Sequence, residues 1–171
     1  MRMLQTVVRS AALMALIAAT AFLLVRHVAV PFLCQHMAAV GATRLDWSME
    51  QSTLVSERVA RGMLGPLRSC ASDSPWESSV HLTLGRVADA AGDHAMAISE
   101  YQQALVTDRR PEIYLALGLA QMASLDRPGA IASLVRACAF DPSRLVDIPY
   151  DDVRAEVTSA LKKRYGKHWI H

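Results

Sequence analysis

The residues of this 171-residue sequence best suited to chemistry are three cysteines and six histidines. The cysteines Cys34, Cys70 and Cys138 show no CxxC spacing, and no histidines pair at a spacing typical of metal ligands, which argues against a zinc site. The sequence also has no Gly-rich phosphate loop and no nucleophile elbow. We therefore expect no enzyme, no catalytic residue, no cofactor, no metal and no small-molecule substrate.

Structural roles explain the cysteines and the central histidine more simply. Cys138 is expected to be a buried thiol at a position that needs a small apolar group. Cys34 and Cys70 would be able to form a disulfide in an oxidising compartment, although the sequence alone does not bring them together. His81 is predicted to face the core with its polar atoms satisfied, not to act as a catalytic base.

The charge of the chain argues against a nucleic-acid partner. The net charge is only +2, and no basic patch is interleaved with aromatic residues. The turn at residues 108–110 and the basic tail at 162–168 are expected to be solvated. The alternatives are that the turn engages an acidic partner, and that the tail, with Tyr165 and Trp169 nearby, contacts lipid headgroups.

Residues 1–33 are predicted to be an N-terminal transmembrane anchor with its flanks. Residues 10–25 are an uncharged run of 16 residues, about 24 Å of helix at about 1.5 Å per residue. Apolar neighbours on both sides lengthen the run toward the roughly 30 Å of a hydrocarbon core. Arg9 and Arg26 would place their charges among the headgroups.

Two other hypotheses for this segment stay open. A signal peptide would be cleaved at Ala19-Thr20-Ala21 and release a soluble exported adaptor, but its mature chain would then begin with apolar residues. A buried helix of a soluble protein is the other. A lipoprotein signal is disfavoured, because Leu33 precedes Cys34 where a small residue is required.

The positive charges that flank the apolar run are nearly balanced. They are Arg2 and Arg9 on one side and Arg26, His27 and Arg44 on the other. A short tail ahead of a signal-like run favours a cytoplasmic amino terminus. We therefore expect a single-pass protein of the inner (cytoplasmic) membrane of a bacterium, with its soluble part in the periplasm or otherwise extracytoplasmic.

An internal repeat occupies residues 78–144. Leu84-Gly85 recurs as Leu117-Gly118, 33 residues later. The same shift aligns Asp93 with Asp126, Ala97 with Ala130, Ile98 with Ile131, Ala104 with Ala137 and Asp108 with Asp141. Apolar spacing predicts helices at 78–91 and 94–107, and an equivalent pair that begins at Pro111.

These residues resemble the tetratricopeptide repeat (TPR), a helix-turn-helix motif of about 34 residues. The second unit, residues 111–144, carries the family's pattern as Tyr114, Leu117-Gly118, Ala130, Leu134, Ala137 and Pro142. The first unit, residues 78–110, departs from it with His81 at the aromatic position and Arg109 at the proline position.

The repeat positions also have a physical explanation. Gly85 and Gly118 are expected where two helix backbones approach closely, and Tyr101 and Leu134 are expected to fill the remaining gap. Two such units cannot bury their apolar faces alone, since about three stacked units are the usual minimum. Other segments must therefore cover both ends of the array.

The end nearer the anchor is expected to be covered from the segment at 34–77. Within it, residues 45–74 are predicted to be a degenerate first unit, with a break or kink where Gly62, Gly65 and Pro66 lie. Such a unit would stack on the repeat at 78–110.

At the other end, in 145–171, residues 150–165 are predicted to be a capping helix with a polar outer face and a basic tail. The expected fold is all-α: an N-terminal transmembrane helix, then a short helix-turn-helix solenoid of two TPR units with a degenerate first unit and a C-terminal capping helix.

The resemblance further implies a partner-binding groove, because the first helix of each TPR unit lines a concave surface. The corresponding positions are Ser79, Leu82, Arg86, Asp89, Glu112, Leu115, Leu119 and Met122. Only Arg86 fits the basic clamp with which some relatives hold a terminal carboxylate. Leu115, Leu119 and Met122 suit an apolar helix or strand of a partner; the alternative is that they pack within the array.

The resulting hypothesis is a membrane-tethered TPR scaffold that docks a protein partner, such as a subunit of a cell-envelope or membrane-bound complex. One alternative is the soluble exported adaptor. The other is an enzyme with an unrecognised site in residues 34–77.

Overall fold

The computed structural model describes residues 2–51 and 53–166, and in this part of the chain the fold is all-α, without strands. The α-helices are α1 (Arg2–Leu24), α2 (Val30–Gln51), α3 (Thr53–Asp73), α4 (Ser78–Ala90), α5 (His94–Thr107), α6 (Pro111–Ala123), α7 (Arg127–Phe140) and α8 (Asp151–Tyr165). A π-helical turn, η1 (Val25–Ala29), and a 3-10 helix, η2 (Pro142–Asp147), complete the description. The predicted fold class is confirmed.

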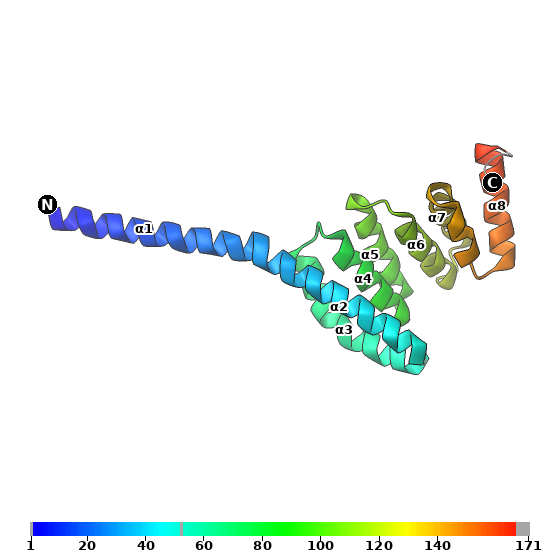
Figure 1. The fold of residues 1–171 in the computed structure, drawn as a ribbon, viewed down its shortest axis with the longest axis horizontal. Coiled ribbons are helices and arrows are strands. Elements are labelled where there is room, and N and C mark those ends of the chain that lie inside the picture. Colours follow the sequence, from blue (N-terminus) through cyan, green and yellow to red (C-terminus); the bar gives the residue numbers. More distant parts are fainter. Residues whose placement is uncertain (1, 52, 167–171) are drawn as a thin grey trace.

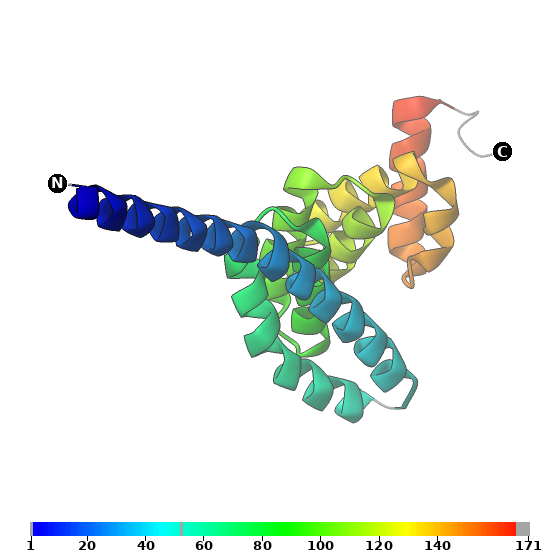
Figure 2. The same cartoon turned by 60° about the vertical axis from the view of Figure 1, so that its left-hand side comes forward.

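Helices α1 and α2 form one long rod, joined by the π-helical turn that contains Arg26 and His27. The rod extends from the rest of the molecule at one end, and α8 lies at the other end of the long axis (Figure 1). Figure 2 shows α3 returning beside the second half of the rod. The anchor predicted at residues 1–33 therefore continues into the folded domain without a break in helix.

The rod contains a stretch that is long and apolar enough to cross a membrane, and this stretch is not buried. A signal sequence near the amino terminus would be long and apolar in the same way. Large apolar side chains along the rod, such as Leu16, Phe22 and Leu33, face outward. An apolar surface of this length is typical of a membrane span or of a signal sequence.

Helices α4 to α7 form two pairs whose boundaries match the sequence prediction to within one residue in the first pair. The carboxylates of Asp93 and Asp126 cap α5 and α7 by accepting hydrogen bonds from the N–H groups of Met96 and Gly129. This is the N-cap arrangement that stabilises the first turn of a helix. Each pair thus begins its second helix with the same local device.

Glycines set the distance between the helices of each pair, as predicted. A Cβ atom on Gly85 would lie 2.6 Å from Cε1 of Tyr101, and one on Gly118 would lie 2.7 Å from Cγ of Leu134. Both partner side chains are buried. Because no side chain fits there, α4 and α6 approach their partner helices closely.

Helices α2 and α3 form the pair that covers α4, and they differ from the sequence prediction in two ways. The break expected at Gly62, Gly65 and Pro66 is absent, since α3 continues through all three residues. These residues are exposed, so the unpaired carbonyl that Pro66 leaves one turn earlier can face water. Tertiary packing of the opposite face, through Ala60, Leu67 and other buried residues, keeps the helix whole.

The unit is also longer than the predicted 45–74, because it begins earlier, at Val30, and ends at Asp73. Its helices have 22 and 21 residues, compared with 13 and 14 in the first regular pair. Helix α2 ends at Gln51 and α3 begins at Thr53, whereas a 33-residue shift of the repeat would place both residues inside one helix. A fixed period therefore could not find the first helix of this pair.

A disulfide between Cys34 and Cys70 joins α2 to α3, with their Cα atoms 5.3 Å apart. The pairing that the sequence left open is thus present. Both cysteines are buried in the cluster that also holds Ala38, Leu67 and Leu84. Cys138 is a free, fully buried thiol, and burial raises its pKa to about 11, as expected for a structural cysteine.

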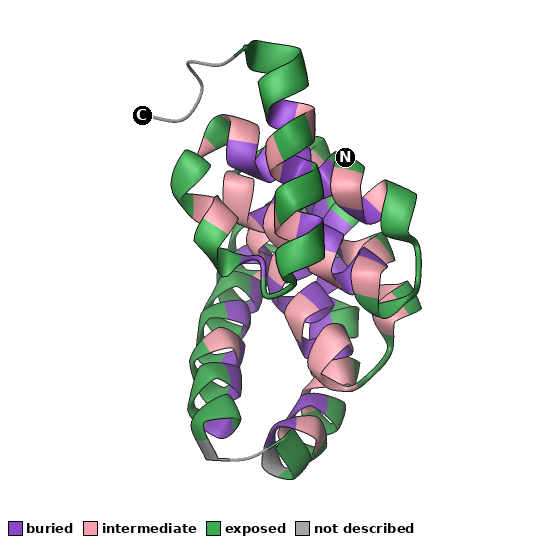
Figure 3. Cartoon of the chain, turned by 90° about the vertical axis from the view of Figure 1, so that its right-hand side faces the viewer, coloured by how far each residue is buried: buried purple, intermediate pink, exposed green. Residues whose placement is uncertain are grey.

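Helix α8 covers the other end of the array, as predicted. Val153, Val157 and Leu161 are buried against α7, while its opposite face is exposed (Figure 3). Lys162, Lys163 and Arg164 lie on this outer face in the last turn. The remainder of the predicted basic tail, from Lys167 onward with Trp169, lies outside the described residues.

Candidate docking surface

A concave hollow of about 600 Å³ lies where α2, α4 and α6 meet the segment before α8. Its lining comes from α2 (Leu45, Met49), α4 (Leu82, Arg86, Asp89, Ala90), α5 (His94, Tyr101), α6 (Glu112, Ala116, Leu119, Ala123) and the loop residues Pro149 and Tyr150. We call this set the concave hollow. It is formed mainly by the first helix of each pair.

The structure brings together five of the eight residues predicted for the groove. Leu82, Arg86, Asp89, Glu112 and Leu119 line the concave hollow. They come from both repeats and lie on one surface.

The other three predicted groove residues lie elsewhere. Leu115 and Met122 pack against the buried cluster formed by α7 and α8, which is the alternative considered for them. Ser79 is half-buried in the first turn of α4 and does not line the hollow. Because α8 occupies the place of a further first helix, it covers the side of α6 on which Leu115 and Met122 lie.

The charged side chains of the hollow are already paired with neighbours. Arg86 forms an ion pair with Asp46 of α2, and Asp89 accepts a hydrogen bond from the ring of His94 of α5, at 2.7 Å. Glu112 lies 3.8 Å from the Arg110 guanidinium. These charged groups therefore already have partners of opposite charge within the chain.

The surface left for a ligand is therefore largely apolar. Leu82, Ala116 and Leu119 form its floor, and exposed apolar residues form its rim. Met49 has 60% of its surface exposed, and Tyr150 has 47%. Exposed apolar residues that gather around a hollow are typical of a protein-docking surface.

Sequence reasoning missed the contributions of α2 and of the loop before α8. Leu45 and Met49 lie outside the repeat, and their helix was placed wrongly, so the period gave no signal for them. Pro149 and Tyr150 follow Ile148, a fully buried residue that anchors the loop. The one sign of this loop in the sequence was the apolar Ile148, which lies just before the helix predicted to begin at residue 150.

His81 has the structural role predicted for it. Its ring is buried between α4, α5 and the turn after α3, with Nδ1 2.7 Å from a Glu100 carboxylate oxygen and Nε2 3.1 Å from the Pro75 carbonyl oxygen. The hydrogen bond to Glu100 raises the pKa of His81 above its usual value, against the opposing effect of burial. Both ring nitrogens are engaged, so neither is available to a substrate.

The segment at 34–77, where an unrecognised active site was the alternative, contains a smaller hollow of about 340 Å³ between α2 and α3. Among its lining residues, His36 and Arg44 are the polar ones able to act in acid–base or anion chemistry, and no carboxylate accompanies them. Among the residues that the structure describes, no group of three His, Cys, Asp or Glu side chains is placed to hold a metal ion.

Comparison with known proteins adds no family to this geometry. No family model matches the sequence, and no curated protein matches it. The chemistry of the concave hollow is therefore given by its own residues: an apolar floor and rim, with charged walls that are paired internally.

Proposed function

We propose that this protein is a membrane-tethered scaffold of the TPR type whose concave hollow docks an apolar helix or strand of a protein partner. The observation that carries the proposal is the hollow itself, with an apolar floor at Leu82 and Leu119 and an exposed apolar rim at Met49 and Tyr150. Burying such a surface would contribute about 25 cal/mol per Å² of apolar area removed from water.

The pairing of the charged walls supports an apolar ligand over a charged one. Arg86 and Asp89 are held by Asp46 and His94, so a carboxylate or a basic peptide would have to compete with contacts inside the domain. An apolar helix or strand faces no such competition. Its recognition would resemble other cases in which an amphipathic segment enters a hydrophobic groove.

The α1–α2 rod supports the proposal that the protein is tethered to a membrane. Its apolar surface is unburied, and the helix leads directly into the pair that forms one wall of the hollow. A partner bound there would be held close to the membrane. We therefore propose that the partner belongs to a membrane-bound or cell-envelope complex.

The disulfide supports an extracytoplasmic location for the helical array. Disulfides persist in oxidising compartments and are rare in the cytosol. Cys34 and Cys70 both follow the apolar stretch, so they lie on the same side of the membrane. The proposed topology is a cytoplasmic amino terminus, one span of the inner membrane and a periplasmic array.

A second candidate is the soluble exported adaptor, because a signal sequence accounts for the apolar stretch equally well. The disulfide and the hollow would be the same in both cases. The mass of the mature protein distinguishes them: an intact chain in the membrane fraction supports the tether, and a chain shortened near Ala21 in the soluble fraction supports the adaptor.

The docking proposal is tested by photocrosslinking in native membranes, with p-benzoylphenylalanine at Leu119. The matched control is Leu125, which is 91% exposed and lies outside the hollow. We expect one discrete heavier adduct from position 119 and none from position 125. Equal labelling from both positions, or none from 119 in membranes that contain the chain, would contradict the proposal.

A further inference from the structure

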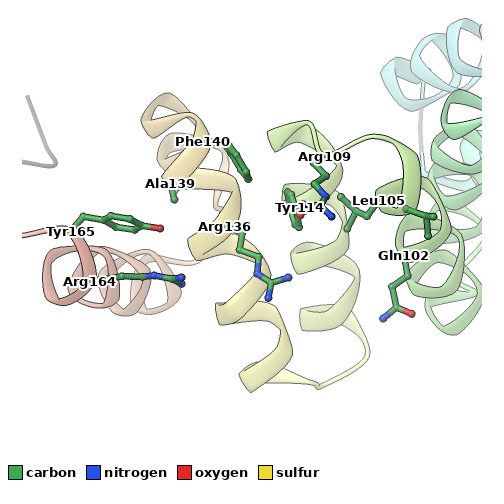
Figure 4. Close-up of a pocket in the computed structure, with 10 residues that line it drawn as sticks. Gln102, Leu105, Arg109, Tyr114, Arg136, Ala139, Phe140, Arg164 and Tyr165 are labelled. Atoms are coloured by element: carbon green, nitrogen blue, oxygen red, sulfur yellow. The ribbon is translucent and has the colours of Figure 1, made fainter.

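A second pocket, of about 610 Å³, lies at the end of the array near α8 and shares no lining residue with the concave hollow. It is formed by the later part of α5, the turn at residues 108–110, the start of α6, and the ends of α7 and α8 (Figure 4). Three arginines and three aromatic residues give it its character: Arg109, Arg136, Arg164, Tyr114, Phe140 and Tyr165. We call these six residues the arginine–aromatic pocket.

Two of the arginines lie over aromatic rings. Cζ of Arg136 lies 6.0 Å from the centre of the Tyr114 ring, which stacks on Phe140 with ring centres 5.8 Å apart. Cζ of Arg164 lies 5.5 Å from the centre of the Tyr165 ring. A guanidinium that stacks through its face keeps its N–H groups free at its edge, where they match the two oxygens of a carboxylate.

Within the described residues, these arginines have no acidic partner, unlike several of their neighbours. Arg110, Arg127 and Arg154 each form an ion pair with a nearby aspartate. Among the described residues, no ion pair includes Arg109, Arg136 or Arg164, and the pocket lining contains no acidic residue. Three positive charges around one pocket create a local potential that attracts an anion.

Exposed aromatic surface accompanies the charges. Phe140 is 62% exposed and Tyr165 is 49% exposed, although both are large apolar groups. Arginine and aromatic residues are the types enriched where protein interfaces are strongest. The pocket therefore offers charge and apolar contact together.

We propose that the arginine–aromatic pocket binds an acidic segment of a protein partner, in which an Asp or Glu side chain lies next to an aromatic or aliphatic one. The carboxylate would accept hydrogen bonds from the free edges of Arg136 and its neighbours, and the apolar side chain would pack on Phe140. The concave hollow suits an apolar partner segment, whereas this pocket suits an acidic one. The pocket is therefore a second and independent docking site.

The position of the pocket favours a protein over a lipid headgroup. α8 lies at the opposite end of the long axis from α1, far from the stretch that would cross the membrane (Figure 1). The size favours a peptide over a nucleic acid, because three arginines surround one pocket instead of forming a stripe along a backbone. The net charge of +2 agrees with a local site, not a broadly basic face.

The test uses the full chain in nanodiscs of neutral phosphatidylcholine, with a displayed library of random twelve-residue peptides as the probe. Selected peptides are counted for Asp and Glu next to Phe, Tyr, Leu or Ile, then labelled with fluorescein and titrated by anisotropy. Arg136→Gln removes a stacked guanidinium. Arg110→Gln is the matched control, since Arg110 is the adjacent turn arginine that is already paired and lines no part of the pocket.

We expect the selected peptides to be enriched in the acidic–apolar pattern. Arg136→Gln should raise their Kd at least about tenfold, the loss of one strong charge-assisted contact, and Arg136→Lys should fall between the two. Arg110→Gln should change the Kd less than about twofold. Unchanged thermal unfolding of the variants shows that they remain folded.

Three results would overturn the proposal: no acidic enrichment among selected peptides, equal affinity for the wild-type chain and Arg136→Gln, or arginine-dependent binding of phosphatidylglycerol vesicles without peptide binding. A Leu119→Glu variant is carried in parallel. If this variant still binds the acidic peptides, the two surfaces bind independently. A negative result at one surface then does not bear on the proposal for the other.

Discussion

The α2–α3 pair and the regular pairs α4–α5 and α6–α7 are held together by different means. Gly85 and Gly118 remove the side chain at the point of contact and let the helices of the regular pairs approach. In α3, a Cβ on Gly62 would meet no atom within 4 Å, and a disulfide joins α3 to α2. Glycine is required for packing at positions 85 and 118 and is incidental at position 62.

This difference shows that the structural role of a glycine depends on the atoms that face it. The sequence predicted a break at Gly62 because glycine and proline together disfavour a helix. A longer helix with a packed inner face tolerates them on its outer face. Mutations that separate these two roles are the clearest way to sharpen the comparison.

The largest effect is expected from removal of the disulfide. Cys34→Ala with Cys70→Ala should lower the free energy of unfolding by about 3–4 kcal/mol, because the bridge closes a loop of 36 residues in the unfolded chain. Chemical unfolding of the full chain in nanodiscs measures this. Hydrogen exchange should show α2 and α3 opening before α4 to α7. Reductant should destabilise the wild-type chain and leave the double variant unchanged; a loss below about 1 kcal/mol would contradict the account.

The next largest effect concerns the close approach in the regular pairs. Gly85→Ala and Gly118→Ala should each cost about 1–3 kcal/mol, since the new Cβ would overlap the Tyr101 ring or Leu134. The control Gly62→Ala should instead stabilise by about 0.5–1 kcal/mol, the gain in helix propensity. Denaturant midpoints give both values, and the same sign for all three variants would break the comparison.

Loss of a helix cap should have a smaller effect. Asp93→Ala and Asp126→Ala should each cost about 1 kcal/mol, because Met96 and Gly129 lose the side-chain acceptor of an N–H group in the first turn. Asp73→Ala is the control, since Asp73 is exposed at the end of α3 and caps no N-terminus. Thermal unfolding measures the difference, and equal results for Asp73 and Asp126 would argue against capping.

The smallest effect is a dependence on pH at His81, which joins the two regions through Pro75 and Glu100. The pKa of His81 is raised in the folded chain, so its contribution is fully present below about pH 6.5, the unfolded value. It is lost as pH rises through the folded value. The wild-type chain should therefore unfold more readily at pH 9 than at pH 6, and His81→Gln should flatten this slope. An unchanged slope in the variant would assign the dependence to other groups.

The regular pairs could be predicted from the sequence because each is encoded locally. Leu84-Gly85, the cap at Asp93 and the small residues that follow all lie within one 33-residue unit. The capping helix was found for the same reason, from the apolar stripe of Val153, Val157 and Leu161. Five of the residues that line the concave hollow were predicted from the resemblance to the TPR.

The features that the sequence did not predict depend on contacts between distant parts of the chain. The α2–α3 pair is a unit of a different length, so the period could not reveal its first helix. Met49 and Tyr150 meet at the concave hollow from positions about 100 residues apart. The arginine–aromatic pocket likewise combines five segments, of which the turn at 108–110 and the basic end of α8 had been noted separately.

The central claim, that the concave hollow docks an apolar partner segment, is tested most directly by Leu119→Glu in the full chain. The partner identified by crosslinking is purified with the wild-type and variant chains from native membranes, and its recovery is compared with Ser159→Glu, a change on the exposed face of α8. A buried charge at position 119 should reduce recovery at least about tenfold while Ser159→Glu leaves it unchanged. Equal recovery with a folded Leu119→Glu chain would contradict the claim.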